Sequence, residues 1–146
     1  MPPMLRKEKK ITMETNNLYN IAEQKGISVS FFPLTESRGV VLENGGKFYI
    51  ALHDGCTERD EKVILAHELG HCLSGGGYSL NDSPLEKIKL EKRAERWAIE
   101  RLVPLYELET AIKQGDEANS ALAERFGVTE EFIQKVLRHY LEKVSA

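Results

Sequence analysis

The sequence predicts an α+β fold in which a small, three-stranded, mostly antiparallel sheet packs against two long helices. Apolar residues recur at helical spacing over most of the chain, which predicts several amphipathic helices. One β-rich segment lies between residues 27 and 52 and contains a single hairpin signal. The 146 residues suffice for one domain at residues 1–114, and we expect a C-terminal helical hairpin at residues 115–146 to pack on it.

The first third of the chain is expected to hold one helix and the whole sheet. The helix runs from Thr12 to Lys25, and Gly26 is a suitable stop. Alternating residues rich in β-formers predict three strands, at residues 27–32, 38–43 and 47–52. Asn44-Gly45-Gly46 lies between the last two strands and is typical of a hairpin turn. Together these segments predict one largely antiparallel sheet.

The rest of the chain is predicted to be helical. Thr57 and Asp60 have the spacing of a capping box, and the helix that they open should reach about Leu73. A glycine-rich loop leads to a second long helix, from Leu85 to Val103, which Pro104 stops. Three shorter helices follow, one at residues 106–113 and two between residues 118 and 143 that meet at residues 126–129.

Composition excludes several classes of protein. The net charge is −3, so the chain has no general electrostatic attraction for nucleic acid. No apolar run approaches the roughly 18 residues needed to span a bilayer. The basic start of the chain is followed by a polar stretch and not by the apolar core of a signal peptide. Cys56 and Cys72 cannot build a disulfide framework, and we expect them to be thiols in a reducing compartment, the cytoplasm.

The segment His-Glu-Leu-Gly-His, residues 67–71, carries the strongest chemical signal. His67 and His71 are four residues apart, so a helix places both imidazoles on one face, able to hold one metal ion. Glu68 lies about 100° around the helix from His67, beside the metal, where a general base can take a proton from water. The alternative is a pair of histidines on an exposed face, but the helix is otherwise largely apolar, and buried histidines need partners.

A third ligand is expected on the second long helix. Glu91 and Glu95 are one turn apart on its apolar face, where carboxylates are unfavourable unless they are paired or bind metal. We assign Glu91 to the metal, and Glu95 to accept a hydrogen bond from the outer N–H of a metal-bound histidine. The reverse assignment stays open, as do surface ion pairs with neighbouring lysines. Gly70, inside the motif, would let a strand or a substrate backbone come close.

Several other features have both a functional and an ordinary structural interpretation. Cys72 points off the metal face, and we expect a core thiol. Tyr78 and His53 could each donate a hydrogen bond to an oxyanion, although ordinary loop and strand-end positions are favoured for both. The tail has the sequence pattern of a helix-turn-helix. Its second helix, however, begins Thr129-Glu130-Glu131, and these acidic residues would repel phosphate. We therefore expect no direct binding to nucleic acid.

At this point the sequence resembles the ImmA/IrrE family of metallopeptidases over about residues 18–104. The resemblance is carried by Val-Ile-Leu-Ala-His-Glu-Leu-Gly-His at residues 63–71, by Glu-Lys-Arg-Ala-Glu-Arg-Trp-Ala at residues 91–98, and by the Leu-Val-Pro close at residues 102–104. It implies a zincin-like fold and a Zn2+ endopeptidase site. In that site His67, His71 and a glutamate of the second block bind the metal, and Glu68 is the catalytic base.

The resemblance also implies a biological role. Such proteins are anti-repressors of prophages and mobile elements that cleave or otherwise inactivate a helix-turn-helix repressor. The alternative is a non-catalytic regulatory interaction protein that retains the fold. The sequence departs from the family at two places. Position 95 is commonly Asn or Asp in phage-type members, and the Gly75-Gly76-Gly77 run stands where many members have a further histidine.

Overall fold

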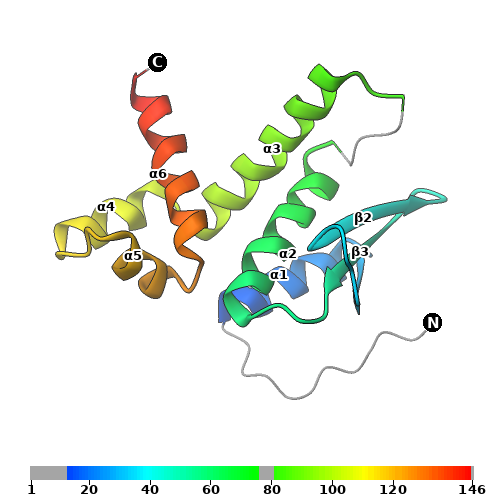
Figure 1. Cartoon of the computed structure of the whole chain (residues 1–146), viewed down its shortest axis with the longest axis horizontal. Helices are drawn as coiled ribbons and strands as arrows, with labels where there is room; N and C mark the ends of the chain where they lie inside the picture. The colour runs from blue at the N-terminus through cyan, green and yellow to red at the C-terminus, as the bar shows by residue number, and fades with distance from the viewer. Residues whose placement is uncertain (1–12, 76–80, 146) are drawn as a thin grey trace.

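A computed structural model describes residues 13–75 and 81–145 of the chain (Figure 1). The described residues form six helices and three strands, close to the bounds that the sequence predicts. No helix in these two stretches is both long and apolar enough to cross a membrane. In chain order the elements are α1 (Met13–Gln24), β1 (Ser28–Phe32), β2 (Gly39–Asn44), β3 (Lys47–His53), α2 (Glu58–Leu73), α3 (Pro84–Leu102), α4 (Leu105–Lys113), α5 (Asn119–Phe126) and α6 (Glu130–Ser145).

The sheet is mixed, with the strand order β1-β3-β2. β2 and β3 form the predicted antiparallel hairpin, which Asn44 and Lys47 close. β1 lies beside β3 and runs parallel to it, with Ser28 opposite Tyr49. The prediction of a largely antiparallel sheet therefore holds for the hairpin alone, because β1 pairs with the far strand of the hairpin and not with its neighbour in sequence. This order leaves β2 as an edge strand.

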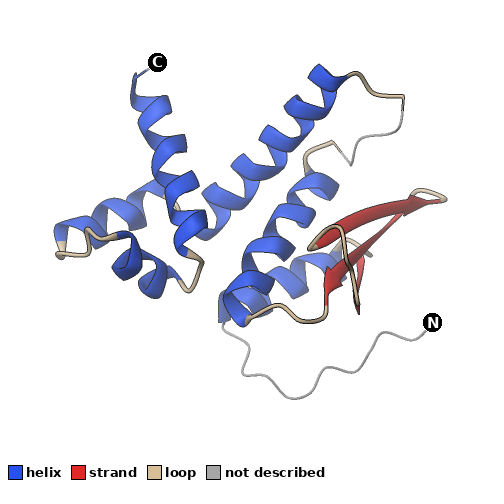
Figure 2. Ribbon diagram, viewed as in Figure 1, coloured by secondary structure: helices blue, strands red, loops and turns tan. Residues whose placement is uncertain are grey.

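Helix α2 occupies the centre of the molecule. Figure 2 shows the sheet on one side of α2 and the C-terminal helices on the other. Thr57 caps the helix as predicted, since its hydroxyl accepts a hydrogen bond from the Asp60 N–H at 3.2 Å. The apolar residues Leu65, Ala66 and Leu69 are fully buried. Because α2 is enclosed on several sides, the positions of its polar residues are tightly fixed.

Gly70 marks the crossing of α2 and α3. A Cβ atom at this position would lie 2.5 Å from the carbonyl oxygen of Ala94 and 3.0 Å from its Cα. The two helix backbones can therefore approach this closely only because position 70 has no side chain. From the sequence we expect a strand or a substrate backbone close to Gly70. The close neighbour is helix α3 instead.

The C-terminal helices pack on the same core. Gly127 ends α5 in the left-handed conformation, with φ of 65°, and turns the chain into α6. Lys62 of α2 is buried and donates a hydrogen bond to the Phe126 carbonyl at the end of α5. Burial lowers the pKa of Lys62, and the charge of Glu14 partly opposes that shift. On α6, the hydroxyl of Tyr140 donates to the Val103 carbonyl at 2.7 Å.

Candidate metal centre

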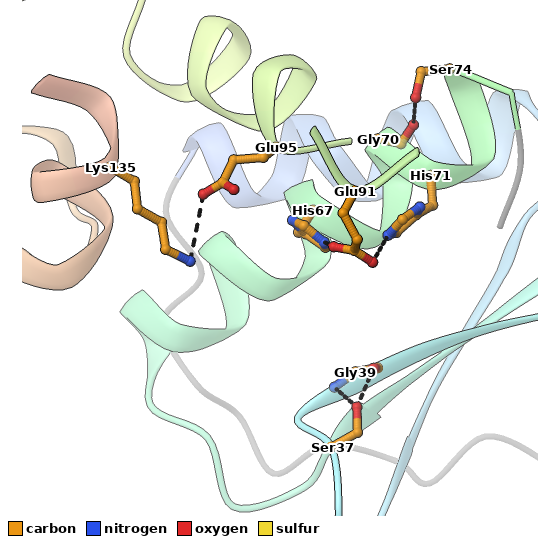
Figure 3. A network of polar contacts seen from close by, with 9 residues as sticks. All are labelled: Ser37, Gly39, His67, Gly70, His71, Ser74, Glu91, Glu95 and Lys135. Atoms are coloured by element: carbon orange, nitrogen blue, oxygen red, sulfur yellow. Dashed lines mark hydrogen bonds and ion pairs between the residues drawn. The ribbon is translucent and has the colours of Figure 1, made fainter. Parts of the chain in front are cut away.

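Helix α2 presents His67 and His71 one turn apart, facing α3. Their rings meet edge to face, with centroids 4.9 Å apart. The Nε2 atom of His67 lies 2.9 Å from one carboxylate oxygen of Glu91, and the Nε2 atom of His71 lies 2.8 Å from the other (Figure 3). The three residues offer ligand atoms within 4.8 Å of one another. The structure thus brings together the two histidines and the glutamate that the sequence singles out.

This donor set fits a zinc ion. Zinc is bound by imidazole nitrogen and carboxylate oxygen at about 2.0–2.2 Å, so ligand atoms around a tetrahedral ion stand about 3.3 Å apart. The separations of 2.8 and 2.9 Å between the histidines and Glu91 are slightly shorter, and a small outward movement of the side chains would admit an ion. Three protein ligands leave a fourth position for water, which is the usual arrangement of a catalytic site.

The electrostatics of the cluster also favour a cation. Hydrogen bonds from His67 and His71 hold the pKa of Glu91 well below its usual range. Burial lowers the pKa of His67, but the hydrogen bond to Glu91 and the nearby acidic charges outweigh burial, so that this pKa is raised overall. Glu91 therefore carries a negative charge between two imidazoles, and a positive partner at that point is stabilising.

Glu68 is 7% exposed and lies beside the cluster. Burial raises its pKa, the charges of His67 and His71 oppose the shift, and the charge of Glu91 adds to it. Gly39, the first residue of β2, packs against this side chain, because a Cβ there would lie 3.1 Å from Glu68 Cγ. A carboxylate with a raised pKa is a better proton acceptor near neutral pH than an ordinary glutamate.

The site opens into a cleft of about 710 Å³. One wall is the start of the edge strand β2, the floor is α2, and the other walls come from α3 and from the first turns of α6. The α6 wall has no clear signal in the sequence, because it depends on how the tail docks. The lining residues are Ser37–Val41, Asp60, Val63, Ile64, His67, Glu68, His71, Glu91, Glu95, Thr129, Glu131, Phe132 and Lys135.

Glu95 has a different partner from the one that the sequence suggests. Its carboxylate lies 3.5 Å from the Nζ atom of Lys135, on α6 (Figure 3). Glu95 therefore forms an ion pair between α3 and α6 at the rim of the cleft. This pair resembles the alternative that the sequence leaves open, in which the glutamates form surface ion pairs with lysines. The lysine comes from the tail and not from α3 itself.

Cys72 and His53 are not among the residues that converge at the metal cluster. Cys72 packs against the hydrophobic core, and burial raises the pKa of its thiol to about 12, so it stays protonated at neutral pH. His53 does not line the cleft, and its Nδ1 atom lies 3.9 Å from the carboxylate of Asp54. Tyr78 falls outside the described residues.

Two histidines, a glutamate and a buried carboxylate beside an open cleft have the chemistry of a metallohydrolase site. Residues 22–138 match the profile of the Peptidase_M78 family, described as the IrrE N-terminal-like domain. The chain therefore belongs to the ImmA/IrrE family of metallopeptidases. A comparison with curated proteins finds no significant match. The family match reaches into α6, so it includes the part of the tail that lines the cleft.

Proposed function

We propose that this protein is a zinc-dependent endopeptidase of zincin-like architecture that cleaves another protein. In this proposal His67, His71 and Glu91 hold the zinc ion and Glu68 is the catalytic base. The observation that carries the proposal is the convergence of both histidine Nε2 atoms on one carboxylate, 2.8 and 2.9 Å away, within the cleft. The raised pKa of the buried Glu68 beside that cluster supports the assignment of the base.

The proposed mechanism divides the work between the metal and the protein. When bound, zinc supplies Lewis acidity, which lowers the pKa of water to about 7 and polarises a carbonyl group. Glu68 accepts the proton of the attacking water and later delivers it to the nitrogen of the leaving amine. Glu68 is only 7% exposed and packs against Gly39, which restricts the access of bulk water to its carboxylate.

The edge of β2 is the proposed docking line for the substrate backbone. The His53 N–H donates to the Arg38 carbonyl at 2.8 Å, which makes Arg38 and His53 a hydrogen-bonded pair of the hairpin. Such pairs alternate along an antiparallel ladder, so Gly39 and Val41, which both line the cleft, direct their N–H and C=O groups away from β3. An extended peptide can add there as a further strand. We therefore propose an unfolded or loop segment of a protein as the substrate.

The family resemblance suggests a helix-turn-helix repressor of a prophage or mobile element as that protein, and the cytoplasm as the location. We propose no direct contact with DNA. Thr129 and Glu131, at the start of the helix that would read DNA, instead line the cleft. The N–H of Phe132 donates to the Thr129 hydroxyl at 3.1 Å, which holds Thr129 against the first turn of α6.

The test is incubation of the zinc-loaded protein with any helix-turn-helix repressor that is encoded beside its gene. Electrophoresis and mass spectrometry of the repressor should show discrete fragments, and a chelator added beforehand should abolish them. A stable complex with intact repressor, unaffected by the chelator, would support the non-catalytic alternative. A repressor that neither binds nor is cut would remove it as the substrate, and a library of unstructured peptides would then test for peptidase activity.

A further inference from the structure

Ser37, which precedes β2, contacts the free edge of the strand from within its own chain. Its hydroxyl accepts a hydrogen bond from the Gly39 N–H at 3.2 Å and donates one to the Gly39 carbonyl at 2.5 Å (Figure 3). Both backbone groups of Gly39 point away from β3 according to the register of the hairpin. One serine hydroxyl therefore satisfies the donor and the acceptor that a neighbouring strand would use.

The contact between Ser37 and Gly39 lies beside the proposed catalytic base. Gly39 is the edge residue that packs directly on Glu68, and Ser37 and Gly39 both line the cleft. Val41, the next residue with outward backbone groups, has no comparable contact among the described residues. The edge is thus covered at the point closest to the proposed catalytic base and open one step further along β2.

We propose that Ser37 guards the substrate-binding edge. Its hydroxyl occupies the Gly39 groups that an incoming peptide backbone needs, so a substrate strand pairs fully with β2 only after Ser37 rotates away. This inference rests on the proposed endopeptidase function. A covered edge also discourages unspecific strand pairing, which is a general hazard of exposed edge strands.

The guard should act on binding and not on the chemical step. Ser37 is exposed, and an exposed side chain changes rotamer within picoseconds to nanoseconds. Rotation is therefore too fast to limit turnover. To pair with Gly39, the substrate must replace the two hydrogen bonds that the Ser37 hydroxyl makes with the Gly39 backbone. Removing the hydroxyl should lower KM and leave kcat nearly unchanged.

Three variants separate the guard from general effects of substitution. Ser37→Ala removes the hydroxyl, and Ser37→Thr keeps one. Thr110→Ala is the matched control, because the Thr110 hydroxyl also bonds a backbone carbonyl, that of Tyr106 at 3.0 Å, on α4 and away from the cleft. The probes are a peptide hydroxamate, which can reach both the metal and the edge of β2, and acetohydroxamate, which reaches the metal alone.

In zinc-loaded protein, Ser37→Ala should bind the peptide hydroxamate about three- to tenfold more tightly than the wild type, as expected when a competing hydrogen bond is lost. Acetohydroxamate should bind all four proteins equally, and Ser37→Thr and Thr110→Ala should resemble the wild type with both probes. A readout that needs no metal is amide exchange of Gly39 in the zinc-free protein, which should be faster in Ser37→Ala only.

Each contrary result has a distinct meaning. If the wild type binds the peptide probe and Ser37→Ala binds it no more tightly, Ser37 does not compete with the substrate for β2. The endopeptidase proposal is unaffected by that result. Unchanged exchange of the Gly39 amide in Ser37→Ala also overturns the guard, because the hydroxyl then does not hold that group. If no variant prefers the peptide hydroxamate over acetohydroxamate, pairing along β2 fails, and the guard fails with it.

Discussion

Replacing Gly70 with alanine should weaken zinc binding although position 70 is not a ligand. The new Cβ would stand 2.5 Å from the Ala94 carbonyl oxygen, whereas ordinary contact begins at 3.4 Å, so α3 must move away by about 0.9 Å. Glu91 lies on α3 one turn before this contact. Zinc–oxygen bonds span only about 2.0–2.2 Å. The separations between Glu91 and the two histidines need to widen by only about 0.4–0.5 Å to admit zinc, so a shift of about 0.9 Å draws the Glu91 carboxylate out of bonding range unless its side chain rearranges.

The expected magnitudes follow from these distances. Perturbing groups that orient metal ligands typically lowers metal affinity about 10- to 100-fold, and we expect a loss in that range. Stability provides a second check. Overpacking costs about 1–3 kcal/mol, which outweighs the gain of roughly 1 kcal/mol from replacing a helical glycine with alanine. Zinc-free Gly70→Ala should therefore unfold more easily than the wild type, by about 1 kcal/mol.

Two measurements test this reasoning. Competition with a chromophoric chelator gives the zinc affinity, and urea unfolding of the zinc-free protein gives its stability. Arg59→Ala is the control, since Arg59 is exposed in the first turn of the same helix. A Gly70→Ala protein that is more stable than the wild type and binds zinc equally well would show that helix propensity alone governs the position, and would refute the crossing argument.

Three further predictions concern other parts of the molecule. Glu91→Ala should lose most of the bound zinc while Glu95→Ala, whose carboxylate pairs with Lys135, keeps it; metal analysis giving the opposite order would reverse the ligand assignment. Gly127→Ala should lower the free energy of unfolding by about 1–2 kcal/mol, because position 127 has φ of 65°, which a side chain disfavours; equal urea midpoints would contradict this. Tyr140→Phe should be about 1 kcal/mol less stable at neutral pH because a buried hydrogen bond is lost. Burial raises the pKa of Tyr140 to about 12, so the unfolded chain ionises first, and the wild type should lose this advantage as pH rises from about 10 towards 12; a constant difference between the two proteins over that range would argue against it.

The helices were predictable because their signals are local. Thr57, Pro104 and Gly127 each mark an end through side-chain or backbone chemistry that acts within a few residues. The shared face of His67 and His71 follows from helix geometry in the same way. The hairpin turn belongs with these features, since its residues determine the turn by themselves.

The rest depends on packing between distant segments. Glu91 and Glu95 share one face of α3, so only the crossing at Gly70 decides which of them meets the histidines. Alternation of residues shows the two faces of a strand but not its neighbour, which is why the parallel pairing of β1 was not predicted. Lys135 gives no signal either, because its place at the cleft depends on how α6 docks.

Glu68 is proposed to act as a base at a zinc site. The most direct test compares the wild type with Glu68→Gln, both loaded with zinc to the same measured content, on one cleavable protein or peptide. The glutamine retains size and polarity and cannot accept the proton. Cleavage by the variant should be at least about a hundredfold slower, which is the lower end of what general base catalysis contributes. Cleavage at the wild-type rate with equal zinc content would show that Glu68 is not the base.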